Sequence, residues 1–69
     1  MTKISNTIRV ERARHRLTQQ DLATEVKCTR QTIHAIENGK FEPKLGLARR
    51  IAKFFNARVE DVFKIEEDD

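Results

Sequence analysis

The stretch from Arg30 to Ala35 holds the residue types best suited to contact with a nucleic acid. The guanidinium of an arginine such as Arg30 can donate two hydrogen bonds to guanine, and the amide of a glutamine such as Gln31 can pair with adenine. The methyl group of Ala35 could touch the methyl group of thymine, although its reach is short. Taken singly, each of these side chains is as common on an ordinary protein surface as in a DNA-binding site. Their interpretation therefore depends on the elements that carry them.

The rest of the sequence offers little competing chemistry. It has no paired nucleophile and base and no glycine-rich phosphate loop, so we do not expect an enzyme. Cys28 is the single cysteine, which rules out an internal disulfide. Cys28, His15 and His34 lack a metal-binding spacing such as C-x-x-C or H-x-x-x-H, so we expect neither a metal nor a cofactor.

Length and charge favour a small intracellular domain. The 69 residues predict one domain over residues 1–69, with a core of a few side chains. Neither a membrane span nor a signal peptide is recognisable, so we expect a cytoplasmic protein. Residues 1–53 carry 12 Lys or Arg against 5 Asp or Glu, whereas residues 54–69 carry 2 against 6. A basic body is typical of a protein that binds a polyanion, and also of a merely soluble one.

Apolar spacing and capping residues predict an all-α fold with five helices. Thr18 and Asp21 resemble a capping box, Thr29 is a second N-cap, and Gly39 and Asn56 are suited to left-handed helix ends. The first helix is expected to begin with Ser5 or Asn6 as its cap. The predicted helices cover residues 6–15, 19–26, 30–37, 43–55 and 59–63.

The C-terminal segment, residues 63–69, has a different pattern. Phe63, Lys64, Ile65 and Glu66 alternate between apolar and polar, which predicts a short strand. The final four residues are all acidic and are expected to form a solvated tail.

Several linked motifs resemble the phage repressor/Cro-type (XRE family) helix-turn-helix regulators. They are Leu17–Ala23, Thr29–Ile33 and Ile36–Lys40, followed by matches that extend the resemblance over roughly residues 6–63. The resemblance implies a compact five-helix DNA-binding domain with its helix-turn-helix motif at residues 19–38. It also implies a transcriptional regulator, expected to be a repressor, whose third helix reads double-stranded DNA in the major groove.

The same resemblance assigns roles to individual residues. The residues expected to read bases are Arg30, Gln31, His34 and Ala35, and those expected to hold phosphates are Gln19, Thr29, Thr32, Asn38 and Lys40. Arg12 is expected to pair with Glu37 inside the domain, as the equivalent residues do in some relatives. Cys28 is expected to fill an apolar turn position, and Lys27 stands where the family often has glycine. The alternatives are that Gln19 and Gln31 are ordinary exposed residues and that Thr29 only caps its helix.

One recognition helix covers too few base pairs for useful specificity, so we expect a homodimer that binds an inverted repeat. The residues expected at its interface are Phe54, Val62, Phe63 and Ile65, with the C-terminal strand paired antiparallel across the two-fold axis. The alternative is that Phe63 and Ile65 only close the core. A second possible function is an antitoxin-like or cofactor-like protein that binds a protein partner through its acidic C-terminal region.

Overall fold

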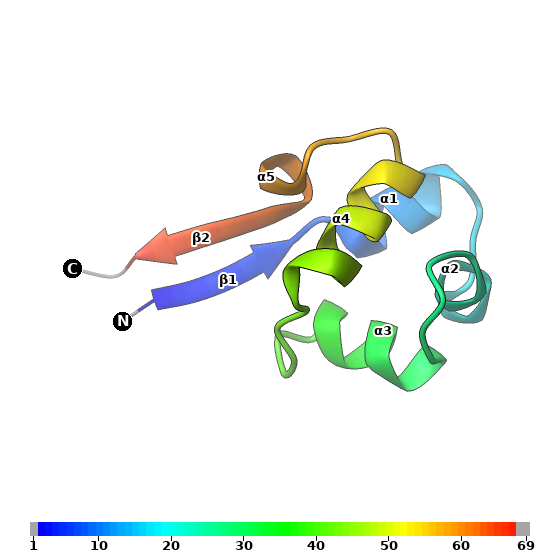
Figure 1. Ribbon diagram of the computed structural model, residues 1–69, viewed down its shortest axis with the longest axis horizontal. Coiled ribbons are helices and arrows are strands. Elements are labelled where there is room, and N and C mark those ends of the chain that lie inside the picture. The colour runs from blue at the N-terminus through cyan, green and yellow to red at the C-terminus, as the bar shows by residue number, and fades with distance from the viewer. Residues whose placement is uncertain (1, 68–69) are drawn as a thin grey trace.

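The computed structural model describes the backbone of residues 2–67 and the side chains of residues 5–64. Over this range the chain forms five helices and one two-stranded sheet, as Figure 1 shows. The predicted helical architecture is therefore confirmed. The elements in chain order are β1 (Thr2–Asn6), α1 (Ile8–Arg14), α2 (Gln19–Glu25), α3 (Arg30–Glu37), α4 (Leu45–Phe54), α5 (Val59–Val62) and β2 (Phe63–Glu67).

The N-terminal strand was not predicted. The first helix begins at Ile8 rather than Asn6, because Thr2–Asn6 pairs with β2 instead of starting the helix. Asn6 still serves the helix start from the end of the strand, since its Oδ1 accepts a hydrogen bond from the backbone N–H of Ile8 at 3.2 Å. Ser5 lies within the strand and is not a cap.

The C-terminal strand is confirmed, but its partner is corrected. β2 pairs antiparallel with β1 of the same chain, in a register that places Ile4 opposite Ile65 and Asn6 opposite Phe63. Because both strands belong to one chain, their effective concentration relative to each other is high, which favours pairing within the chain over pairing with a second copy. The resulting ribbon projects from the helices with both termini at its far end (Figure 1). Residues 68 and 69 of the predicted acidic tail lie outside the described residues.

The core lies between the five helices and is made mostly of aliphatic side chains, with the ring of Phe55 at 6% exposure. Those with 0–2% exposure are Ile8, Leu22, Ala23, Val26, Ile33, Ile36, Ile51, Ala52 and Val62. Val62 is therefore a core residue, which corrects its placement at a dimer interface. It lies inward because α5 is a single turn with its two valines toward the core, Val62 buried and Val59 partly buried, which leaves Glu60 and Asp61 in solvent.

The connections between helices take the expected left-handed conformations. Gly39, Lys27 and Asn56 have φ values of 72°, 62° and 55°. Arg16, between α1 and α2, has a φ of 54°, and no feature of the sequence predicted it. Lys27 lies in the turn between α2 and α3, so its conformation directs α3 away from the end of α2. None of the described helices is long and apolar enough to cross a membrane.

Candidate nucleic-acid interface

The candidate interface is built on α2 and α3, which are both capped at their N-termini. The Thr18 hydroxyl accepts from the Asp21 backbone N–H, and the Asp21 carboxylate accepts from the Thr18 N–H, each at 3.0 Å. The hydrogen bond from the Thr18 backbone, with that of its side chain, lowers the pKa of Asp21. The hydroxyl of Thr29 caps α3 by accepting from the Thr32 N–H at 3.2 Å. Both helices therefore begin at fixed residues, which fixes the side chains they present.

The turn between the two helices is held from beneath by the core. The backbone N–H of Cys28 donates to the carbonyl of Ala23 at 2.9 Å. The Cys28 side chain packs partly buried against the core, and this burial raises the pKa of its thiol. The structure thus places Cys28 in the apolar turn position that was expected of it.

α3 has one buried and one exposed face. Ile33 and Ile36 point into the core, while Arg30, Gln31 and His34 are exposed and Ala35 is partly buried. Arg30 and Gln31 make no side-chain hydrogen bond or ion pair with any described residue. Their polar groups are thus available to a ligand, in the first turn of a capped helix.

His34 differs from its neighbours on this face, because protein groups lie beside both nitrogens of its ring. Nδ1 lies 3.4 Å from the amide nitrogen of Gln19, and Nε2 lies 3.1 Å from the amide nitrogen of Asn38. Neither contact was predicted from the sequence.

The residues expected to hold phosphates surround α3. Gln19 begins α2 and is partly buried, and Thr29 and Thr32 lie at the N-terminal end of α3 with their hydroxyl oxygens 2.9 Å apart. Asn38 is the C-cap of α3, and Lys40 follows Gly39 as an exposed cation. The structure therefore brings all five to the two ends of the helix that carries Arg30.

A buried ion pair supports this surface from within. The Nε of Arg12 lies 2.7 Å from Oε2 of Glu37, whose side chain is 1% exposed, so the expected pairing is present. Glu37 also accepts from Gln19 at 3.3 Å and lies 3.6 Å from Arg9. Burial alone would raise the pKa of Glu37, but the hydrogen bonds from Arg12 and Gln19 and the two arginine charges outweigh it and hold that pKa below its ordinary value. The contacts with Arg9 and Gln19 were not predicted.

An apolar groove lies to one side of α3, between the start of α4 and α5. It has a volume of about 380 Å³, and Leu45, Val59 and Phe63 line it between the carboxylates of Glu42 and Glu60. Leu45 is 67% exposed there. Of the residues expected at a dimer interface, Phe63 lies in this groove and Phe54 is exposed on α4, while the side chain of Ile65 lies outside the described ones.

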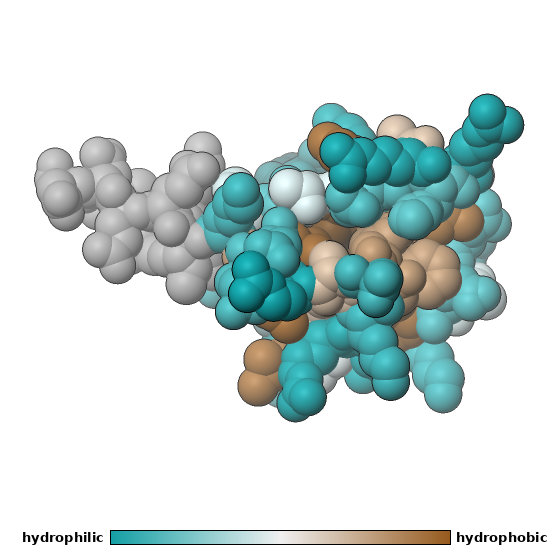
Figure 2. All heavy atoms as spheres, turned by 90° about the horizontal axis from the view of Figure 1, so that it is seen from above, coloured by the Kyte–Doolittle hydropathy of each residue, from teal (hydrophilic) through white to brown (hydrophobic). Residues whose placement is uncertain are grey.

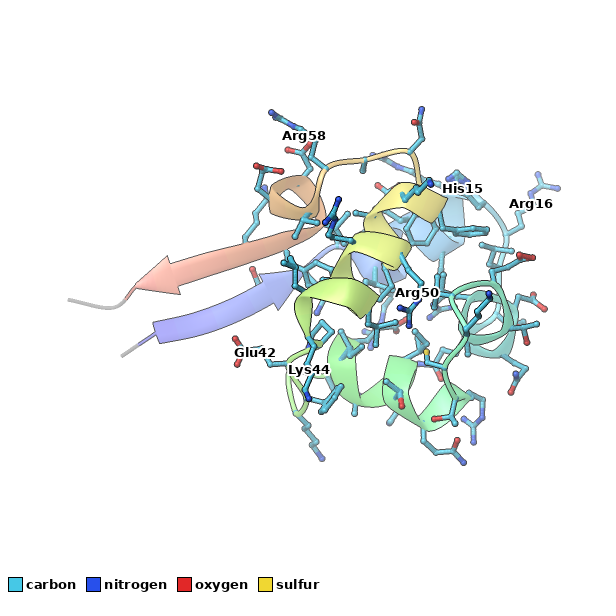
Figure 3. All side chains as sticks on the ribbon, in the orientation of Figure 1. His15, Arg16, Glu42, Lys44, Arg50 and Arg58 are labelled. Carbon is cyan, nitrogen blue, oxygen red and sulfur yellow. The ribbon has the colours of Figure 1, made fainter. Side chains whose placement is uncertain are left out.

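A second hollow is basic and was not anticipated. Arg49, Arg50, Lys53 and Arg58 border it on α4 and the loop that follows. Arg50 extends from α4 toward the end of α2, where its Nε donates to the carbonyl of Val26 at 2.9 Å, and Arg58 projects at the edge opposite α3 (Figure 3). Seen from the side opposite α3, the surface consists of hydrophilic side chains around a smaller apolar area (Figure 2). The cations of this chain are therefore distributed around the body rather than confined to the α3 surface.

Comparisons with known proteins agree with this geometry. The helix-turn-helix family matches residues 8–67 of the chain. An uncharacterised HTH-type transcriptional regulator of Methanocaldococcus jannaschii is 50% identical over 66 residues, which cover 96% of this chain and 100% of that protein. An uncharacterised regulator of the same type from Archaeoglobus fulgidus is 45% identical over 90% of this chain and 89% of its own length. The uncharacterised HTH-type regulator YgzD of Bacillus subtilis is 43% identical over 94% of this chain and 98% of its own.

Proposed function

This chain belongs to the XRE-type helix-turn-helix family of transcriptional regulators, and on that premise we propose that it represses transcription by binding an inverted-repeat operator as a homodimer. The observation that carries the proposal is the exposed edge of α3, where Arg30 and Gln31 have no hydrogen-bond or ion-pair partner among the described side chains, on a helix whose opposite face is core. A helix of this kind fits the major groove of B-form DNA. A repressor of this size acts by occupying the site that polymerase would use.

Arg30 and Gln31 are the proposed base-reading residues. Arg30 would donate to O6 and N7 of guanine, and Gln31 would pair with N6 and N7 of adenine, each contact contributing about 1–3 kcal/mol of discrimination. Ala35 is partly buried, and its methyl group would contact the methyl group of a thymine. Both long side chains are already exposed, so reading needs no change in the backbone.

The phosphate contacts are proposed for Gln19, Thr29, Thr32, Asn38 and Lys40. Because these residues lie at both ends of α3, phosphates on either side of the groove would fix the helix between them. Lys40 is the cation of this set and would contribute most to the salt dependence of binding.

The homodimer is proposed to form at the apolar groove lined by Leu45, Val59 and Phe63. The groove is lined by residues of the loop before α4, of α4, of α5 and of the start of β2, and by none of the residues proposed to contact DNA, so two copies that meet there would leave both α3 surfaces open. An inverted repeat requires this arrangement, with the two helices one DNA turn or about 34 Å apart. Leu45 is 67% exposed in one protomer and would be covered in this dimer.

Selection of bound duplexes from a random pool tests DNA recognition. The recovered site should be an inverted repeat, and Arg30→Ala and Gln31→Ala should each relax the preference at particular base pairs. Arg49→Ala is the matched control, because Arg49 is an exposed cation on α4 and should leave the preference intact. Recovery of unrelated sequences by the unmodified chain would refute the proposal.

Sedimentation tests the dimer. Leu45→Asp should convert the dimer to a monomer, since it places a charge in the proposed interface. Val10→Asp is the control, because Val10 is also an exposed apolar residue, at 54%, but lies on α1 away from the groove. An unchanged dimer in the Leu45 variant would exclude this face.

A further inference from the structure

Two arginines of α1 lie over the same buried carboxylate. Arg9 and Arg12 are one helical turn apart, so their side chains leave the same face of the helix. Arg12 is 16% exposed and binds both oxygens of Glu37, at 2.7 and 3.1 Å. Arg9 is 70% exposed, and its Nε lies 3.6 Å from one of these oxygens. Glu37 is therefore covered by one arginine from within and by a second from the solvent side.

Glu37 is fully paired without Arg9. Both of its oxygens accept from Arg12, and Oε1 also accepts from the amide of Gln19 at 3.3 Å. Among the causes that hold the pKa of Glu37 below its ordinary value, the charge of Arg9 has the smallest effect. Arg9 itself makes no hydrogen bond with a described residue, so its N–H groups and its charge are available to a ligand.

Arg9 also lies beside the surface proposed to bind DNA. Its Nε and the amide nitrogen of Gln19 approach the same oxygen of Glu37, so the two side chains are neighbours. Gln19 begins α2, and its amide nitrogen lies 3.4 Å from Nδ1 of His34 on the exposed face of α3. Three helices therefore meet at this corner, and Arg9 adds an exposed positive charge to it.

From this geometry we infer that Arg9 binds a phosphate of the DNA backbone beside the start of α2. A guanidinium can donate two parallel hydrogen bonds to a phosphate, and the donors of Arg9 are unused. Glu37 opposes a phosphate there only weakly, because Arg12 neutralises it at 2.7 Å. The inference rests on the proposed function and adds α1 to the helices that contact DNA.

The salt dependence of binding to the selected operator tests this role. Arg9→Gln should weaken binding by roughly tenfold for each protomer and make the salt slope shallower by about 0.9 for each protomer, the value for one phosphate contact on B-form DNA. Arg9→Lys keeps the charge and should keep the slope. Neither variant should change the order of base preference, since a phosphate carries no sequence information. An unchanged slope in Arg9→Gln would overturn the inference.

Arg14→Gln is the matched control. Arg14 lies on the same helix, its side chain is also 70% exposed, and it too pairs with one glutamate, at 3.2 Å from Glu11. Its place in the sequence puts it on a different face of α1 from Arg9. This variant should keep the salt slope. A loss as large as that in Arg9→Gln would mean that net charge rather than a contact sets the slope, and would overturn the inference.

Operators that carry one methylphosphonate, which lacks the charge of a phosphate, locate the contact. One position in each half-site should weaken binding of the unmodified chain but have no further effect on Arg9→Gln, because the two partners act together. Equal losses for the two proteins at every position would overturn the inference.

Urea unfolding separates this role from a structural one. Arg9→Gln should keep the urea midpoint of the unmodified chain, because Glu37 retains both hydrogen bonds from Arg12. A lower midpoint with an unchanged salt slope would make Arg9 part of the ion pair alone, against the inference. Failure of the unmodified chain to select any sequence would instead overturn the proposed function, and with it the role given to Arg9.

Discussion

Glu37→Gln tests how much of the fold depends on the buried ion pair. The carboxylate is 1% exposed and accepts from Arg12 at 2.7 and 3.1 Å, so the guanidinium binds both of its oxygens. The amide of glutamine keeps the shape and one acceptor oxygen but removes the charge. Arg12, at 16% exposure, would then keep its positive charge with no full partner.

The magnitude follows from two opposing terms. Unit charges 2.7 Å apart attract by about 6 kcal/mol at an effective dielectric constant of about 20, which is the upper limit of the effect. The cost of desolvating Glu37 disappears in the variant and offsets part of that loss. We therefore expect a loss of about 2–4 kcal/mol in the free energy of unfolding, since an arginine left unpaired inside a protein costs about this much. A domain of this length has about 3–10 kcal/mol in total, so the variant should be close to unfolding.

Urea unfolding followed by far-ultraviolet circular dichroism at neutral pH measures this loss. Glu11→Gln is the matched control, because Glu11 pairs with Arg14 at 3.2 Å on the surface of α1 and Arg14 is 70% exposed. That variant should lose no more than about 0.5 kcal/mol. If Glu37→Gln cost no more than Glu11→Gln, the ion pair would not support the helices as we argue.

Three further predictions concern pH, backbone conformation and salt. The pKa values of Glu37 and Asp21 lie below their ordinary 4.5 and 3.8, so the unfolded chain binds protons first and the urea midpoint should begin to fall as the pH drops through about 4.5. Gly46→Ala should raise the free energy of unfolding by about 1 kcal/mol, because the nearest atom to the added methyl is 3.8 Å away in a helix. Gly39→Ala should lower that free energy by about the same amount, because its φ of 72° is left-handed. Lys40→Ala should weaken binding to all duplexes and make the salt slope shallower by about 1, as measured by titration at several salt concentrations.

The parts of the fold that sequence reasoning predicted are those with local causes. Thr18 and Asp21 lie three residues apart and cap α2 by themselves, and Gly39 ends α3 by its own conformational freedom. Lys27 is a contrasting case, because the turn imposes a left-handed φ of 62° on a residue that does not favour this conformation. Features that depend on residues a few positions apart can therefore be predicted from the sequence.

The N-terminal strand has no such local cause. Its partner begins about 60 residues later, and the register of Thr2 opposite Glu67 depends on where α5 delivers the chain. Ser5 and Asn6 are good helix caps, so local reasoning favoured a cap where tertiary pairing imposes a strand. Val62 was misplaced for a related reason, since the number of apolar positions that a one-turn helix buries depends on what packs above it.

The candidate site, too, could be predicted where its features are local and not where they depend on tertiary packing. Residue types and the family resemblance predicted which side chains lie on α3 and predicted the pair of Arg12 and Glu37. They did not predict that Gln19 joins Glu37 or that His34 lies between two amides, because both contacts depend on the angle between α2 and α3. That angle is set by the core and by the turn at Lys27.

Stability and DNA binding therefore share one series of contacts, which runs from Arg12 on α1 through Glu37 to Gln19 and His34. Glu37→Gln and His34→Ala interrupt it at different points. The first should lower both the free energy of unfolding and the affinity for DNA, because it removes the charge that holds α1 to α3 and leaves a single acceptor oxygen for Arg12 and Gln19. The second should leave stability within about 0.5 kcal/mol, since His34 is exposed and the amides beside it return to water. A loss of stability in His34→Ala as large as that in Glu37→Gln would mean that the ring itself holds α2 and α3 together, and that the series does not depend mainly on the charge of Glu37.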